Sequence, residues 1–238
     1  MLWASRRLQL AGAFGSGQGL FLGHFALAFA AKKADPQVSL GTYFLAAQLP
    51  DMLWPCFVLA GVEHVSIAPG DTAFTPLRFD SYPFSHSLLA VALWASVMAG
   101  LHYLSKHRAR AAALIGLLVV SHWILDYVSH RADMPLFPGR SPRLGLGLWN
   151  SVPATLAVES ALFVGGVTLC LAATRGRDRV GSYGFAALVG LLGIVYVANV
   201  AGPPPPSAEA VAIVCLLGVG LIITGAAWVD RHRQAIAG

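Results

Sequence analysis

The chain has 238 residues, of which 56% are hydrophobic and only 11% are charged, with a formal net charge of +5. A soluble domain carries roughly twice that charged fraction, so the composition excludes an ordinary soluble protein and indicates a polytopic membrane protein. The positive charge is concentrated in short loops and gives no reason to expect a nucleic-acid partner.

A bilayer core about 30 Å thick needs about 20 apolar residues per helix. Windows of this kind predict an all-α transmembrane bundle of about six to seven helices in contact with the lipid bilayer. The predicted segments are 17–31, 38–62, 85–104, 111–130, 154–174, 182–201 and 208–230. The first is short for a span, so a re-entrant segment or a signal anchor is an alternative to a crossing helix.

Three parts of the chain are expected to differ in role. Residues 1–20, which include Arg6 and Arg7, are interpreted as an N-terminal extension. A secretory signal peptide is the alternative, and its removal would take His24 with it. Residues 21–181 are predicted to form the bundle that carries the candidate site, and 182–238 two structural C-terminal helices.

Charge predicts the orientation of the bundle. Most of the 16 Lys and Arg residues lie in the short segments 32–33, 106–110, 175–179 and 231–233. Seven crossings would put all four segments on one side, which the positive-inside rule makes the cytoplasm. The sequence therefore predicts a multi-pass protein with a cytoplasmic C-terminus, with Arg6 and Arg7 as the exception.

Ionisable residues occur in the first three predicted segments. His24 lies at mid-depth in the first, and His86 opens the third on the outer side. Asp51 lies in the second, between Pro50 and Pro55. These prolines should kink or unwind the helix, free backbone carbonyls and admit water near the carboxylate.

The fourth segment carries His122, Asp126 and His130, which recur every fourth residue. Residues four apart lie on one face of a helix, so the three side chains should point toward a common target. A charge at the bilayer centre costs about 2.5 to 3.5 kcal/mol on insertion scales, and an acid there is a functional-site candidate.

Three histidines and two carboxylates converging in a partly desolvated place suit a divalent metal: His24, Asp51, His86, His122 and Asp126. Imidazole and carboxylate favour zinc, with manganese or iron as alternatives. An open coordination position would let bound water ionise near neutral pH. The alternatives are a proton relay and hydrogen-bonding contacts between helices, each worth about 0.6 to 2 kcal/mol.

Four other polar residues are weaker candidates for supporting the site or for a lid over it: Asp80, Asp133, Asn150 and Glu159. The loop 131–150 is rich in Pro and Gly and too polar to span, so it is the candidate lid. The three cysteines lie in predicted helices without paired spacing, which argues against a disulfide framework or a cysteine-rich zinc site.

Four motifs in this order resemble the membrane-bound metal-dependent hydrolases of the bacterial inner membrane: Gly-His (23–24), Leu-Pro-Asp (49–51), Phe-Ser-His-Ser (84–87) and Ser-His-x-x-x-Asp (121–126). The resemblance covers about residues 22–135. It implies that the same three histidines and two aspartates are the metal-binding or catalytic set. It also implies an all-helical bundle distantly similar to zinc-dependent phospholipase C.

The chain departs from that family at two positions. Many members have a second Asp where this chain has Leu53, and a His where it has Ser81. If those relatives bind two metals, this chain would bind one, or would recruit Asp80, His130 or Asp133.

The first functional interpretation is a metal-dependent membrane hydrolase that acts on a membrane-derived ester or phosphoester at the non-cytoplasmic side. Asp51 would be a ligand or the general base, and His130 would protonate the leaving group. The alternatives are a small transporter or proton-coupled permease that uses the same residues, and a non-catalytic membrane scaffold.

Overall fold

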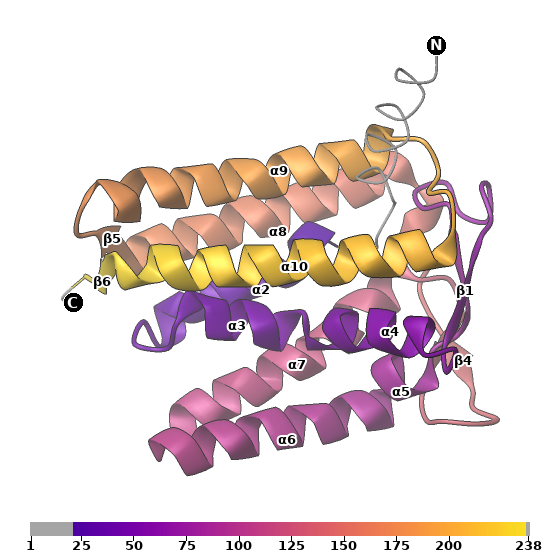
Figure 1. The fold of residues 1–238 in the computed structure, drawn as a ribbon, viewed down its shortest axis with the longest axis horizontal. Coiled ribbons are helices and arrows are strands. Elements are labelled where there is room, and N and C mark those ends of the chain that lie inside the picture. The colour runs from indigo at the N-terminus through magenta and orange to yellow at the C-terminus, as the bar shows by residue number, and fades with distance from the viewer. Residues whose placement is uncertain (1–20, 237–238) are drawn as a thin grey trace.

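The computed structural model describes residues 21–236, and it is built mainly from helices that run along one common direction (Figure 1). The α-helices are α2 (Phe21–Ala34), α3 (Leu40–Ala47), α4 (Leu49–Leu59), α5 (Pro83–His86), α6 (Leu88–Lys106), α7 (Ala109–Ser129), α8 (Val152–Ala173), α9 (Phe185–Ala201) and α10 (Ala208–Arg231). A 3-10 turn, η1 (Leu148–Asn150), precedes α8, and a π-helical turn, η2 (Val180–Gly184), leads into α9.

Short antiparallel pairs of strands lie at the two ends of the described bundle. They are β1 (His64–Ile67) with β2 (Leu77–Ser81), β3 (Met134–Pro135) with β4 (Arg143–Leu144), and β5 (Thr174–Gly176) with β6 (Arg233–Ala235). In Figure 1, β1 and β4 lie at one end, and β5 and β6 lie at the other.

Serine residues define where several helices begin. The Ser39, Ser87, Ser151 and Ser207 side chains accept hydrogen bonds from the first-turn amides of α3, α6, α8 and α10. Such N-caps satisfy backbone donors that have no partner within the helix. At the other end of α6, His107 adopts φ 52° and terminates the helix in a left-handed conformation.

Within residues 21–236, five helical segments are long and apolar enough to cross a membrane: α6, α7, α8, η2 with α9, and α10. Their outer faces expose large apolar side chains, such as Leu93, Ile194 and Leu221. An apolar outer surface of this kind suits a lipid environment. The all-α membrane bundle expected from the sequence is therefore confirmed.

The first two predicted segments form shorter helices. The 14 residues of α2 span about 21 Å, which is less than a bilayer core. The segment predicted over 38–62 divides into α3 and α4 at Gln48. Phe25 and Phe29 of α2 are fully buried, and Phe29 contacts the rings of Phe44 and Phe185. Thus α2 forms the centre of the core instead of a lipid-facing span.

Close helix contacts surround α2, which packs against α8, α3 and α7. A Cβ added to Gly166 of α8 would lie 2.2 Å from the Ala26 carbonyl oxygen, so the α2–α8 approach requires glycine. Helix α10 lies along α3 and α4 (Figure 1). The two C-terminal helices therefore pack on the rest of the bundle, and α10 covers α3 and α4, the helix that carries Asp51.

The four basic segments gather at one end of the bundle, which we call the basic end. Lys32 binds Asp230 at 2.9 Å, and Arg108 binds Asp35 at 2.8 Å. Strands β5 and β6 join the remaining two segments. Asp126 lies 17 residues along α7 from Ala109, about 25 Å from this end. Arg6 and Arg7 lie outside the described residues.

Candidate metal centre

Four chain segments bring the predicted residues together. His24 comes from α2, Asp51 from α4, His86 from the end of α5, and His122 and Asp126 from α7. We call these five residues the His/Asp cluster. The four other than Asp51 are buried, and the Asp51 side chain is 27% exposed. Asp51 is therefore the most accessible member.

The side chains of the cluster meet through imidazole nitrogens and carboxylate oxygens. Asp126 Oδ1 lies 3.2 Å from His24 Nε2, and Asp126 Oδ2 lies 3.1 Å from His122 Nε2. His86 Nε2 lies 3.7 Å from Asp126 Oδ2 and 3.5 Å from Asp51 Oδ1. Asp51 Oδ1 is also 3.7 Å from His122 Nε2. The His24 and His122 rings stack with centroids 3.8 Å apart.

These separations can be compared with those around a metal. Nitrogen and oxygen ligands at 2.0 to 2.2 Å from a tetrahedral zinc ion lie roughly 3.4 Å from one another. The observed separations run from 3.1 to 3.7 Å. Two overlapping groups, His24–His122–Asp126 and Asp51–His86–His122, can each gather one ligand atom per residue within 4.8 Å. The donors and their spacing therefore fit a divalent metal ion.

Hydrogen bonds determine which nitrogen of the His122 and His86 rings is available to bind a metal. His122 Nδ1 lies 2.7 Å from the Ala47 carbonyl oxygen, which only accepts, so Nδ1 carries the hydrogen. His86 Nδ1 lies 2.7 Å from Ser85 Oγ, and the Ser85 hydroxyl donates to Glu63 at 2.6 Å. The hydroxyl has one hydrogen, so it accepts from His86 Nδ1. Both rings thus direct an unprotonated Nε2 into the cluster when neutral.

Glu63 was missed by the sequence analysis. It is fully buried and also accepts hydrogen bonds from the backbone amides of Phe84 and Ser85, at 2.7 and 2.9 Å. It therefore holds the short helix α5 as well as the Ser85 hydroxyl. The Ser next to His86 in the sequence was a signal for a supporting contact, but no spacing connects Glu63 to a residue 22 positions away.

The proline-rich segment positions Asp51. The helix breaks at Gln48, just before Pro50, and α4 then continues through Pro55. Pro50 has no N–H and suits the first turn of a helix, so α4 begins here. The break expected near Asp51 is present, and it makes Ala47 the last residue of α3, where its carbonyl accepts from His122.

His130 lies in a second, adjoining cluster. Helix α7 ends at Ser129, so His130 leaves the helical face shared by His122 and Asp126. Its Nδ1 lies 2.9 Å from Asp133 Oδ1, and its ring contacts Trp149 at a centroid distance of 4.1 Å. The role of His130 as an acid for a leaving group stays a prediction.

Asp133 is stabilised in its ionised form. Burial raises the pKa of Asp133, whereas the hydrogen bond and charge of His130 lower it. Hydrogen bonds from Tyr82 and Arg131 lower it further, so the pKa of this carboxyl lies below its usual value. Conversely, burial and the Asp133 charge raise the pKa of Tyr82 well above its usual value. Tyr82 is thus a hydrogen-bond donor to Asp133.

The remaining predicted support residues are placed differently. Glu159 is buried on α8 and accepts from the Leu22 amide at 2.9 Å, so it holds the first turn of the helix that carries His24. Asp80 is paired with Arg78 on the β1–β2 hairpin. Asn150 ends η1 and is exposed.

The fold and the cluster define a helical, multi-pass membrane protein with a buried group of histidines and aspartates among its helices. The chain belongs to the YdjM inner membrane protein family, whose model matches residues 18–202. The match includes the whole His/Asp cluster and helices α2 to α9, and α10 follows it. Neither a curated protein nor a solved structure matches the chain.

Family membership supports the expected location in the bacterial inner membrane. The family description names an inner membrane protein without an activity. The hydrolase and phospholipase C aspects of the resemblance therefore stay predictions.

Proposed function

We propose that this protein is a metal-dependent hydrolase that acts on an ester or phosphoester of membrane origin. One observation carries the proposal: three imidazole Nε2 atoms and two carboxylates converge at 3.1 to 3.7 Å in the interior of a membrane bundle. Isolated buried acids are costly in a membrane, and such residues commonly mark a functional site.

Zinc is the proposed metal, with manganese or iron as alternatives, because the donors are nitrogen and oxygen atoms. His24, His86, His122 and Asp126 would hold it. With one coordination position left open for water, such a metal would supply a hydroxide nucleophile near neutral pH and would polarise an ester or phosphoryl oxygen. Asp51 is more exposed than the other four, which suits a carboxylate that accepts a proton from the entering water.

The proposed site opens on the non-cytoplasmic side. The cluster is about 25 Å from the basic end along α7, and the positive-inside rule assigns the basic end to the cytoplasm. A site near the opposite interface would meet the headgroup region of lipids, where ester and phosphoester linkages occur.

Metal content is the direct test. The full chain, purified in mild detergent, is analysed by inductively coupled plasma mass spectrometry with His122→Ala and Asp126→Ala. His64→Ala is the matched control, because His64 is exposed on β1. We expect about one equivalent of metal in the wild type and control, lost in both cluster variants while they remain folded.

A folded wild type that takes up no metal after reconstitution would overturn the proposal. Lower stability of the two variants without any bound metal would instead support interhelical hydrogen bonding. Proton-coupled transport by the metal-free protein would favour the permease.

A further inference from the structure

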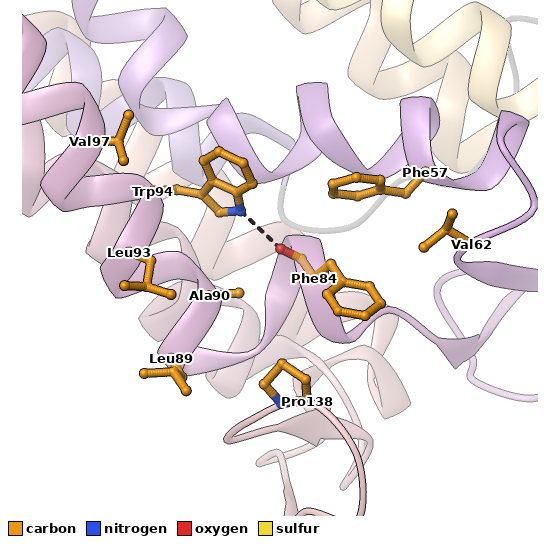
Figure 2. Close-up of a pocket in the computed structure, with 9 residues that line it drawn as sticks. All are labelled: Phe57, Val62, Phe84, Leu89, Ala90, Leu93, Trp94, Val97 and Pro138. Atoms are coloured by element: carbon orange, nitrogen blue, oxygen red, sulfur yellow. Dashed lines mark hydrogen bonds between the residues drawn. The ribbon is translucent and has the colours of Figure 1, made fainter.

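An apolar groove lies between α4, α5 and α6 (Figure 2). Its volume is about 450 Å³, within the range of small-molecule sites. The lining is formed by Phe57, Val62, Phe84, Leu89, Ala90, Leu93, Trp94, Val97 and Pro138. The Trp94 Nε1–H donates to the Phe84 carbonyl oxygen at 2.9 Å, so the one polar side-chain atom of this lining is satisfied within the protein.

The groove is open toward the surroundings of the bundle. Leu89 is 51% exposed and Leu93 is 60% exposed, although both belong to a helix that is apolar and long enough to span. Since the protein is an inner-membrane protein, this side of α6 faces lipid. The molecules that meet the groove first are therefore the acyl chains of the bilayer.

Two elements connect the groove with the His/Asp cluster. Phe84 lines the groove and lies on α5, the helix that ends with His86. Phe57 lines it from α4, which carries Asp51. From Leu89 to Val97 the groove follows α6 for about 12 Å, away from His86 and toward the middle of the span. A chain lying in it would thus have one end near the cluster.

We propose that this groove holds one acyl chain of a membrane phospholipid, with the glycerol and headgroup linkages placed at the His/Asp cluster. This inference rests on the proposed hydrolase function and names its substrate class. Lipid tails are as apolar as the groove, so transfer from the bilayer gives little hydrophobic gain. Selection comes from packing against the aromatic walls and from the attachment of the chain to a headgroup near the polar residues.

The loop 131–150 borders the groove. Pro138 contributes to the lining, and the Leu136 carbonyl accepts from the Leu89 amide at 3.0 Å. The predicted lid therefore contacts the groove at the first turn of α6, where the linkage between chain and headgroup would lie.

Photo-crosslinking tests the proposal. The full chain is placed in phospholipid nanodiscs that contain phosphatidylethanolamine with a diazirine on one acyl chain, irradiated, and mapped by peptide mass spectrometry. We expect adducts concentrated on Leu89, Leu93 and Val97. Ala90→Phe, which fills the base of the groove, should reduce them about tenfold. Ala92→Phe, on an exposed position of the same helix outside the lining, should not change them.

A second pair of variants covers the case in which Ala90→Phe does not fold. Leu93→Trp narrows the groove, and Leu101→Trp is the control, because Leu101 is equally exposed on α6 but does not line the groove. Adducts spread evenly over α6 and unaffected by either filling variant would overturn the inference.

Metal content measured on the same samples separates the two proposals. Bound metal without groove adducts would contradict only the lipid inference. Groove adducts in a folded protein that binds no metal would contradict the hydrolase, and the lipid would then be a ligand without being a substrate.

Discussion

Asp126 faces three imidazole rings from three different helices in the apolar part of the molecule. His24 and His122 both lie within 3.2 Å of its carboxylate, and His86 lies at 3.7 Å. An unpaired charge at this depth is costly, so the carboxylate depends on all of these partners. Removing any one of these side chains alters the surroundings of the others. The changes in the free energy of unfolding caused by two such substitutions should therefore not be additive.

Glu63→Gln tests the support of His86. The amide oxygen can still accept from the Phe84 and Ser85 amides, so α5 should stay in place. The Ser85 hydroxyl loses its carboxylate acceptor, which weakens the orientation of His86. We expect metal affinity, measured by competition with a chelator, to fall about tenfold to a hundredfold.

Glu209→Gln, on the first turn of α10, is the control for that charge change and should leave the affinity unchanged. A Glu63→Gln protein with wild-type metal affinity at every pH would show that the Glu63–Ser85 contact only holds the backbone.

Asp133→Asn tests the contact of this carboxylate with His130. The folded-state pKa of Asp133 is lowered, so its contribution to stability is complete above the unfolded pKa of about 3.9 and is lost as pH falls through the folded value. We expect the variant to be about 1 to 3 kcal/mol less stable at neutral pH. The difference should shrink in acid, as measured by thermal unfolding in detergent from about pH 7 to pH 3. A constant difference over that range would contradict the expectation.

At the scale of elements, helical spacing explained part of α7 and failed at its end. His122 and Asp126 are four residues apart and contact each other at 3.1 Å. His130 has the same spacing from Asp126, but the helix ends one residue earlier, and His130 turns toward Asp133. Periodicity describes a face only while the helix continues, and the end of this helix depends on its contacts with the following loop.

The close approach of α2 and α8 gives an element-scale prediction. Gly166→Ala would push a Cβ against the Ala26 backbone and separate the helix that carries His24 from its neighbour. We expect a loss of about 1 to 3 kcal/mol of stability, measured by thermal unfolding in detergent. Gly165→Ala is the matched control, because a Cβ there meets nothing within 4 Å, and it should leave stability unchanged or raise it by up to about 1 kcal/mol through higher helix propensity. Equal effects of the two substitutions would contradict this packing.

At the scale of the whole molecule, charge is strongly polarised along the bundle. The ion pairs of Lys32 with Asp230 and of Arg108 with Asp35 join helices that are far apart in sequence at the basic end. The His/Asp cluster lies toward the other end. Because the two lie toward opposite ends, the orientation of the protein in the membrane determines from which side the cluster is reached.

Reporter fusions test this orientation. A fluorescent protein that matures only in the cytoplasm should fluoresce when fused after residue 238. Alkaline phosphatase, which needs the periplasm to fold, should be active when inserted in the loop between β3 and β4. Both expectations follow from the positive-inside rule, which assigns the basic end to the cytoplasm and the opposite end of the bundle to the periplasm. In the controls the two reporters exchange positions, and both should then be inactive. The reverse pattern would assign the His/Asp cluster to the cytoplasmic side.

Local sequence patterns were sufficient to predict the class of the protein and to select the candidate residues. Hydrophobic length and low charge predicted a helical membrane bundle, because every backbone polar group in a bilayer must be satisfied within a helix or a closed barrel. The rarity of ionisable residues in such helices made His24, Asp51, His86, His122 and Asp126 recognisable. Each of these signals is carried by neighbouring residues and can be read along the chain.

Contacts between distant segments were needed for the rest. The assignment of α2 to the core, the Glu63–Ser85–His86 chain of hydrogen bonds and the groove beside α6 all depend on helices meeting in space. No sequence spacing encodes such meetings, because they follow from the packing of many side chains at once. The same packing moved His130 out of the stripe of residues that the sequence placed on one helix face.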